Sequence, residues 1–240
     1  MKASERIIVA LDVDSIDEVR SIVEKVGKNV ATFKVGMRLF TKYGPSLVKE
    51  LKQKGYGVFL DLKYHDIPNT VETACLEASE LGVDMLTIHA CGGAEMCRSA
   101  VRGAEAGAKK AGNKIPTVLA VTVLTSMNEE ALKGVGVNRP IPLQVMALAE
   151  MAINEGVGGI VCSALEVKEL KQKIKKDFVA VVPGIRLPDG DTNDQKRIAS
   201  PEVAVNDGAD YLVMGRPIYA AKDPVEALNR TCALIEGIKK

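Results

Sequence analysis

The sequence lacks an excess of charge of either sign. Its 32 Lys and Arg residues are balanced by 31 Asp and Glu residues, which gives a formal net charge of +1. Proteins that hold nucleic acid or anionic membrane surfaces mainly by charge carry a basic excess, so the composition favours neither partner. We therefore expect no nucleic acid and no membrane among the partners. Any anion that binds must be held by a local arrangement of groups.

The sequence also lacks paired cysteines and long apolar runs. Its five cysteines form no Cys-x-x-Cys pair and no metal-ligand spacing, and most lie in apolar stretches. This usage is typical of reduced thiols that pack in a cytoplasmic protein. The apolar run from Ile7 to Leu11 ends at Asp12 and is too short for a signal peptide or a membrane span. We expect a cytoplasmic protein in which this run forms the first strand.

No linker, low-complexity segment or change of composition divides the chain, so we expect a single domain over residues 1–240. Short β-branched runs alternate with amphipathic stretches throughout. The expected strands are Ile7–Val13, Ala31–Gly36, Val58–Leu62, Met85–Ala90, Thr117–Leu124, Gly159–Ser163, Phe178–Pro183 and Tyr211–Gly215. The expected helices are Ser15–Val26, Pro45–Lys54, Asn69–Leu81, Ala94–Ala111, Pro142–Glu155, Glu166–Lys175, Pro201–Asp207 and Pro224–Ile235.

Strict alternation of strands and helices predicts parallel strands. Eight such units suit a closed barrel, whereas an open doubly wound sheet usually has about five or six strands. No Gly-x-Gly-x-x-Gly motif follows the first strand, which argues further against a dinucleotide-binding fold. The sequence therefore predicts an α/β protein with a (β/α)8 TIM-barrel fold. Its active site should lie at the carboxyl ends of the strands.

Charged residues interrupt the predicted strands near those carboxyl ends, where buried parallel strands are normally apolar. Asp12 lies near the end of the first strand, Lys34 lies in the second, and Asp61 and Lys63 lie at the end of the third. Side chains alternate along a strand, so Asp61 and Lys63 share a face, which we expect to point to the barrel axis. Ions of alternating sign tolerate burial because they pair. A structural salt-bridge network is the alternative, but charges gathered at one end of neighbouring strands favour a functional site.

The segment from Asp61 to Thr70 (DLKYHDIPNT) resembles the signature of the orotidine 5′-phosphate decarboxylase family. The resemblance continues in order along the chain through Leu11-Asp12, Lys34-Val35-Gly36, 121–126 (VTVLTS), 183–186 (PGIR) and Gly215-Arg216. It implies decarboxylation of orotidine 5′-monophosphate to uridine 5′-monophosphate and carbon dioxide, the last step of UMP biosynthesis. It also implies that this chemistry needs neither a metal nor an organic cofactor.

This reaction leaves an electron pair on C6 of the pyrimidine, so the site must stabilise a carbanion and deliver a proton to it. Lys63 suits both tasks. Asp61 is expected near the departing carboxylate, where like-charge repulsion is relieved. The resemblance implies that Asp66 and Lys34 hold Lys63 charged and in position, and that Lys34 and Asp12 bind ribose hydroxyls.

The resemblance also implies a homodimer with shared active sites. In the family, the segment that matches Asp66, Ile67 and Thr70 completes the site of the neighbouring subunit. We therefore expect these three residues to act across the interface, which one chain's sequence does not show by itself.

The ends of the seventh and eighth strands predict a phosphate site. Gly215 lets a backbone N–H approach an anion, and Arg216 offers a bidentate guanidinium. The polar segment 186–195 (RLPDGDTNDQ) has the composition of an ordinary surface loop, but its place after the seventh strand suits a lid. The resemblance implies that Arg186 and Gln195 contact the phosphate.

Some assignments have alternatives. Thr125 is expected to hydrogen-bond the pyrimidine edge, but either Thr125 or Ser126 could instead cap a helix. His89 points inward on the fourth strand and suits a barrel-core histidine at least as well as a catalytic one. The alternative function is a magnesium-dependent sugar-phosphate aldolase or decarboxylase, against which the Lys34 ammonium argues because it opposes a metal ion. A catalytically silent nucleotide-binding protein is a third hypothesis.

Overall fold

In the computed structural model, which describes residues 1–187 and 199–237, eight parallel strands form a closed barrel. The strands are β1 (Ile7–Ala10), β2 (Thr32–Gly36), β3 (Gly57–Tyr64), β4 (Met85–His89), β5 (Thr117–Val121), β6 (Gly159–Val161), β7 (Val179–Val182) and β8 (Tyr211–Met214). Each strand pairs with its neighbours in sequence, and β8 closes the barrel on β1, with Ile8 opposite Val213. The predicted (β/α)8 TIM-barrel fold is confirmed.

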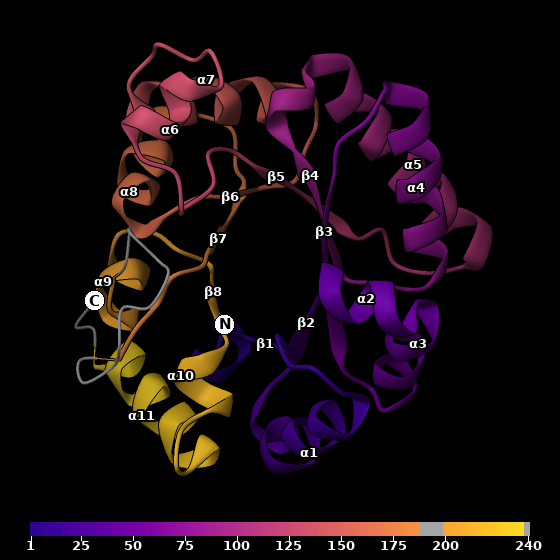
Figure 1. Cartoon of the computed structure of the whole chain (residues 1–240), viewed down its shortest axis with the longest axis vertical. Coiled ribbons are helices and arrows are strands. Elements are labelled where there is room, and N and C mark those ends of the chain that lie inside the picture. The colour runs from indigo at the N-terminus through magenta and orange to yellow at the C-terminus, as the bar shows by residue number, and fades with distance from the viewer. Residues whose placement is uncertain (188–198, 238–240) are drawn as a thin grey trace.

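Helices surround this barrel on all sides (Figure 1). They are α1 (Ile16–Val26), α2 (Met37–Tyr43), α3 (Pro45–Gln53), α4 (Pro68–Glu80), α5 (Ala94–Ala111), α6 (Glu129–Gly134), α7 (Ile141–Asn154), α8 (Ala164–Lys173), α9 (Pro201–Asn206), α10 (Arg216–Tyr219) and α11 (Pro224–Glu236). Short 3-10 turns occur at η1 (Ala3–Arg6), η2 (Gly27–Asn29) and η3 (Ala90–Gly92). Within the described residues, no helix combines the length and apolar composition needed to cross a membrane.

The sequence does not predict α2, α6 or α10. These helices have seven, six and four residues, and helices of this length carry little of the periodic apolar pattern that predicts longer ones. The other helices occupy their expected places, and their ends differ from the expected ones by a residue or two. The missed helices lie between the elements that we expected.

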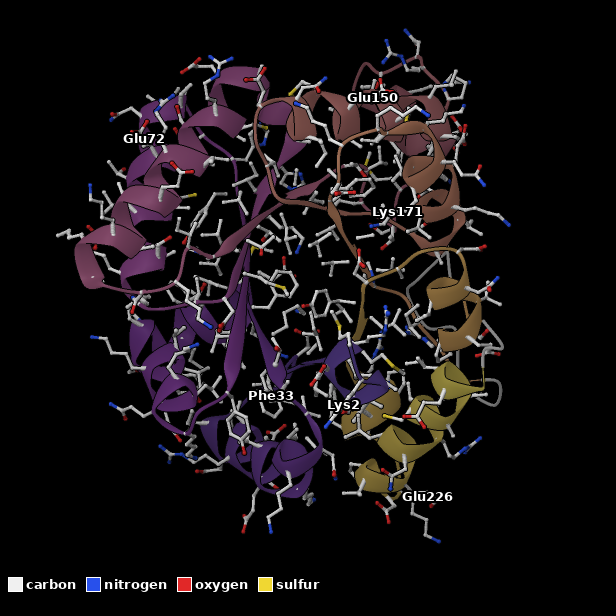
Figure 2. The ribbon with its side chains drawn as sticks, turned by 180° about the vertical axis from the view of Figure 1, so that it is seen from behind. Lys2, Phe33, Glu72, Glu150, Lys171 and Glu226 are labelled. Atoms are coloured by element: carbon white, nitrogen blue, oxygen red, sulfur yellow. The ribbon has the colours of Figure 1, made fainter. Side chains whose placement is uncertain are left out.

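Two apolar layers hold the barrel together. The outer layer packs between strands and helices and includes Phe33 and Leu60, both fully buried. The inner layer fills the barrel with Ile8, Phe59 and Leu119, so the barrel interior is a packed core. Charged side chains such as those of Glu72 and Glu226 lie on the outside of the helix ring (Figure 2).

The tightest helix contact joins α4 and α5. A Cβ atom built on Gly103 would lie 2.0 Å from the carbonyl oxygen of Glu72, and one on Gly107 would lie 2.1 Å from that of Leu76. The two glycines therefore let the backbones of the helices touch. This contact fixes the position of α4, which begins directly after the loop that follows β3.

Two strands, β1 and β5, each end three residues earlier than expected. β1 ends at Ala10 and β5 at Val121, because their ladders with the neighbouring strands stop there. Asp12 and Thr125 therefore lie in loops beyond the strands. Both remain at the carboxyl end of the barrel, where the cavity described next opens.

Candidate active site

A cavity of about 830 Å³ opens at the carboxyl ends of the strands. That volume suits a small organic ligand such as a nucleotide. Most residues that the sequence singles out line it, namely Asp12, Lys34, Asp61, Lys63, Thr125, Ser126, Arg186, Gly215 and Arg216. An apolar part of its wall comes from Phe59, Val121, Val161 and Val213. The predicted residues from six strand ends thus meet in one cavity.

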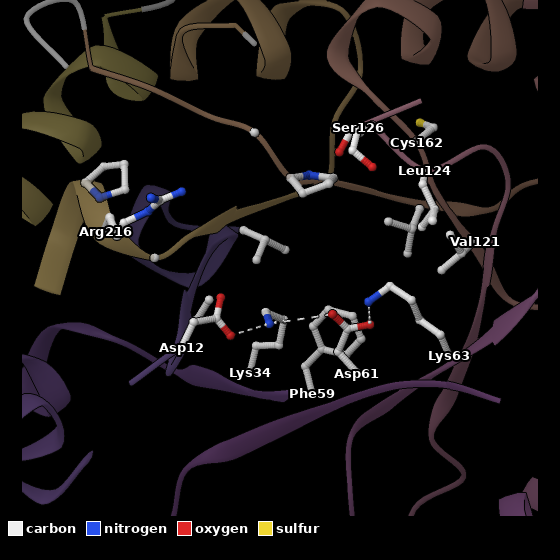
Figure 3. Close-up of a pocket in the computed structure, with 18 of the residues that line it drawn as sticks. Asp12, Lys34, Phe59, Asp61, Lys63, Val121, Leu124, Ser126, Cys162 and Arg216 are labelled. Atoms are coloured by element: carbon white, nitrogen blue, oxygen red, sulfur yellow. Dashed lines mark hydrogen bonds and ion pairs between the residues drawn. The ribbon is translucent and has the colours of Figure 1, made fainter. Parts of the chain in front are cut away.

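Four charged groups of alternating sign form a row along one side of the cavity (Figure 3). The ammonium of Lys34 lies 2.9 Å from Oδ1 of Asp12 and 3.6 Å from Oδ2 of Asp61. Nζ of Lys63 lies 2.7 Å from Oδ1 of Asp61. The Asp61 carboxylate therefore accepts a hydrogen bond from Lys63 and faces the ammonium of Lys34. The ion-pair array that alternation along the strands predicts is present.

Burial makes the pairing within this array strong. Lys34 is 8% exposed. Its desolvation, which lowers the pKa, is outweighed by the carboxylates of Asp61 and Asp12, so the pKa of Lys34 is raised. Desolvation would raise the pKa of Asp61, but Lys34 and Lys63 outweigh it, and the pKa of Asp61 is lowered. Both groups are therefore ionised near neutral pH.

The end of β3 is irregular where it carries Lys63. Leu60 pairs with Leu86 and Tyr64 with Ile88, so β3 has two residues more than β4 between these pairs. Lys63 has a φ of 52°, in the left-handed region that side chains other than glycine rarely adopt. This β-bulge sets the direction in which the Lys63 side chain leaves the strand.

Two arginines line the cavity as well as Lys63. Arg216 begins α10 directly after β8 and lies across the cavity (Figure 3). Arg186 follows β7, is 9% exposed, and donates to the carbonyl oxygen of Ile185. Gln195 lies outside the described residues, as does most of the expected lid.

Three further sequence predictions concern Thr125, Ser126 and His89. Thr125 and Ser126 both line the cavity, so either is placed to meet a ligand. His89 ends β4, and its ring centroid lies 5.6 Å from that of His65. Within the described residues, Nδ1 of His89 is buried without a hydrogen-bond partner. Burial lowers the pKa of His89, and His65 and Lys63 add to this effect.

Asp66, Ile67 and Thr70 do not join the array within their own chain. They follow β3 at the start of α4 and are exposed, Ile67 by 67%. The Asp66 carboxylate accepts a hydrogen bond from the backbone N–H of Ile67. Among the ion pairs of the described residues, the partner of Lys63 is Asp61.

The structure adds two residues, Thr87 and Tyr219, whose contacts the sequence does not indicate. Thr87 on β4 hydrogen-bonds both Asp61 and the backbone of Lys63. The hydroxyl of Tyr219, which also lines the cavity, donates to the carbonyl oxygen of Asp12. A threonine in a strand and a tyrosine in a short helix carry no signal of such roles. Over the described ranges, no group of three or more His, Cys, Asp or Glu side chains is arranged to hold a metal ion.

Comparison with known proteins identifies the family of the chain. Residues 5–231 match the model of the family described as orotidine 5′-phosphate decarboxylase / HUMPS. Proteins named orotidine 5′-phosphate decarboxylase from Citrifermentans bemidjiense and Legionella pneumophila strain Lens are each 46% identical to the chain. The first match covers 95% of both chains, and the second covers 93% of this chain and 96% of the relative.

Among solved structures, orotidine 5′-phosphate decarboxylase from Lactobacillus acidophilus superimposes with a TM-score of 0.87 at 41% identity. The match covers 97% of this chain and 100% of that one. These relatives carry the name of the decarboxylase and not that of the magnesium-dependent aldolase, so the alternative function is not favoured. The chain belongs to the orotidine 5′-phosphate decarboxylase / HUMPS family.

Proposed function

We infer that this protein is an enzyme that decarboxylates orotidine 5′-monophosphate to uridine 5′-monophosphate and carbon dioxide in pyrimidine biosynthesis. Relatives that match nearly the whole chain carry the name of this enzyme. The observation that carries the inference is the row of paired charges beside the cavity, because it brings an ammonium group, which can stabilise a carbanion, to the cavity wall.

Lys63 stabilises and protonates the carbanion in this proposal. The bond between C6 and the carboxylate carbon breaks, carbon dioxide leaves, and the electron pair stays on C6 of the pyrimidine. The Lys63 ammonium then transfers a proton to C6 and is left as a neutral amine, which takes up a proton before the next turnover. Preorganised charge lowers the barrier of this step because it needs no rearrangement during the reaction.

Asp61 and Lys34 prepare this step. Asp61 stays ionised next to Lys63, so the substrate carboxylate is held near a second negative charge until carbon dioxide leaves. Lys34 lies between Asp61 and Asp12, and with Asp12 it binds the ribose hydroxyls. In this proposal Lys63 and Asp61 lie beside the pyrimidine, and Lys34 and Asp12 lie beside the ribose.

The phosphate binds at the far side of the cavity. Arg186 and Arg216 both line this side, and Gly215 lets a backbone N–H approach the phosphate oxygens. In this proposal Gln195, which lies outside the described residues, also contacts the phosphate, and Thr125 hydrogen-bonds the pyrimidine. Binding of the phosphate, a group remote from C6, thereby contributes binding energy to catalysis at C6.

A homodimer completes the site. Asp66, Ile67 and Thr70 reach the site of the partner subunit, where Asp66 faces Lys63. Two observations support this proposal. Asp66 lies past the end of β3 without an ammonium partner among the described residues, and Ile67 exposes an apolar side chain beside it. A large exposed apolar side chain is stabilised when a subunit interface buries it.

Mixing two inactive variants tests the shared site. We expect Lys63→Ala and Asp66→Asn each to be nearly inactive alone. After the subunits exchange, each mixed dimer contains one site with both residues intact, so about a quarter of the sites recover activity. A mixture that stays inactive although mass spectrometry detects mixed dimers would refute the sharing of sites.

We also propose that the protein is cytoplasmic. The spacing of its cysteines suits reduced thiols, and its reaction belongs to biosynthesis. Fractionation of cells, followed by detection of the chain with an antibody, tests this location. Recovery in a membrane or secreted fraction would contradict it.

One assay tests the function and the absence of a metal together. The loss of the ultraviolet absorbance of the orotate ring is followed after the protein is added to orotidine 5′-monophosphate, with and without EDTA. We expect turnover that EDTA does not change. No loss of absorbance would refute the decarboxylase, and turnover that EDTA abolishes and magnesium restores would refute chemistry without a metal.

A further inference from the structure

Thr87 occupies the position on β4 that faces the bulge of β3. It lies between Leu86 and Ile88, which pair with Leu60 and Tyr64, so three residues of β3 face Thr87 alone. Its side chain is fully buried. An ordinary ladder cannot form where three residues face one, so a side chain has to satisfy backbone groups of the bulge.

The hydroxyl of Thr87 makes two hydrogen bonds there. Its oxygen accepts from the backbone N–H of Lys63 at 2.8 Å, and its own proton is therefore free to go to Oδ1 of Asp61, 3.0 Å away. The same Oδ1 accepts from Nζ of Lys63 at 2.7 Å. The three residues thus form a closed ring that joins the backbone of Lys63 to its own ammonium.

We propose that Thr87 is a positioning residue of the decarboxylase site, which fixes the Lys63 backbone and the Asp61 carboxylate with one hydroxyl. The assignment rests on the proposed function. Lys63 stands at a positive φ that costs free energy, so its backbone relaxes unless a contact holds it. The hydrogen bond from Lys63 to Thr87 is such a contact, and it determines where the ammonium enters the cavity.

The charges around Asp61 make the second hydrogen bond measurable. Lys34 faces Asp61 from β2, Lys63 from β3 and His89 from β4. The hydrogen bond from Thr87 also lowers the pKa of Asp61. Loss of the hydroxyl therefore raises the pKa of Asp61, and the acid limb of the activity profile moves to higher pH.

Substitutions at position 87 separate the hydroxyl from the shape of the side chain. Thr87→Val keeps the shape and removes the hydroxyl, whereas Thr87→Ser keeps the hydroxyl and removes a methyl group. Thr87→Ala differs from Thr87→Ser by the oxygen alone, so this pair gives the same comparison if the valine variant does not fold. For each variant we would measure kcat, KM, the pH profile of kcat/KM, the Kd of uridine 5′-monophosphate, and Tm.

We expect Thr87→Val to lower kcat by about ten- to a hundredfold, as loss of a hydrogen bond to a charged group does. The Kd of uridine 5′-monophosphate should change less than about threefold, because the ribose and phosphate contacts remain. Thr87→Ser should keep kcat within about threefold of the unsubstituted enzyme.

Two results would overturn the assignment. One is an unchanged kcat and acid limb in Thr87→Val. The other is an equal loss in Thr87→Ser and Thr87→Ala, which would show that packing and not the hydroxyl matters. An unsubstituted protein that does not convert orotidine 5′-monophosphate refutes the function instead, so the two failures are distinguishable.

Discussion

The ammonium of Lys63 lies 2.7 Å from the carboxylate of Asp61, although only one residue separates them on the same strand. Regular alternation places both side chains on one face, and the bulge brings their charged ends into contact. The pair is formed by two side chains of the protein itself. Substrate therefore meets a site whose charges are already arranged, which is the condition for electrostatic catalysis.

Lys63→Ala should abolish turnover. The loss of both the cation and the proton donor should lower kcat by about 10⁴-fold or more, while uridine 5′-monophosphate still binds. Steady-state kinetics and calorimetry measure the two effects. Lys175→Ala, which changes an exposed lysine far along the chain, is the control and should leave both unchanged. A Lys63→Ala enzyme with nearly unchanged kcat would disprove the assigned role.

Asp61→Asn should destabilise the protein as well as inactivate it. The substitution keeps the shape but leaves the ammonium groups of Lys34 and Lys63 facing each other without the shared carboxylate. Breaking a buried ion pair costs about 3 kcal/mol of unfolding free energy. Urea denaturation measures it, with the exposed Asp177→Asn as control. Equal unfolding free energies of Asp61→Asn and the control would show that the row of paired charges contributes little to stability.

His89 should make the protein less stable in mild acid. Burial, with His65 and Lys63, lowers the pKa of His89 in the folded protein below its ordinary value of 6.5. The unfolded chain therefore binds a proton at a higher pH than the folded one, and stability is lost as the pH falls through about 6.5. His89→Gln removes this titration. We expect the unfolding free energy to fall less between pH 8 and pH 5.5 in His89→Gln, and an identical fall in both proteins would contradict the prediction.

Gly103→Ala should destabilise the contact between α4 and α5. The new Cβ atom would meet the carbonyl oxygen of Glu72 at 2.0 Å, so the helices must separate. We expect a loss of about 2 kcal/mol or more, measured by denaturation. Gly134→Ala is the matched control, because nothing lies within 4 Å of its Cβ position. It should be neutral or stabilise by up to about 1 kcal/mol. Equal effects of the two substitutions would contradict this account.

Much of the fold was predictable because its signals are local. Alternating strand and helix patterns predicted the barrel, and charges at Asp61 and Lys63 predicted the side of the barrel that carries the site. The row of paired charges was predictable because buried ions of one sign need ions of the other sign beside them. Residue roles and the single-domain organisation stay predictions.

The remaining features depend on contacts between distant segments. A lysine in a sequence does not indicate a left-handed backbone, so the φ of Lys63 could not be predicted. It depends on Thr87 of the next strand, which accepts a hydrogen bond from the backbone of the bulge. The short helix α10 is too brief for periodicity to reveal it. Asp66 forms no ion pair among the described residues, so neither the sequence pattern nor the fold of one chain tests the role proposed for it.

The pairing of β1 with β8 has a consequence for synthesis on the ribosome. Ile8 pairs with Val213, which is synthesised about two hundred residues later. The edge of β1 that pairs with β8 therefore stays open until nearly the whole chain has been made. An open edge is a template for pairing with other chains. We therefore expect aggregation of the nascent protein to be limited by whatever covers this edge until β8 is made, whether a chaperone or rapid folding of the neighbouring units.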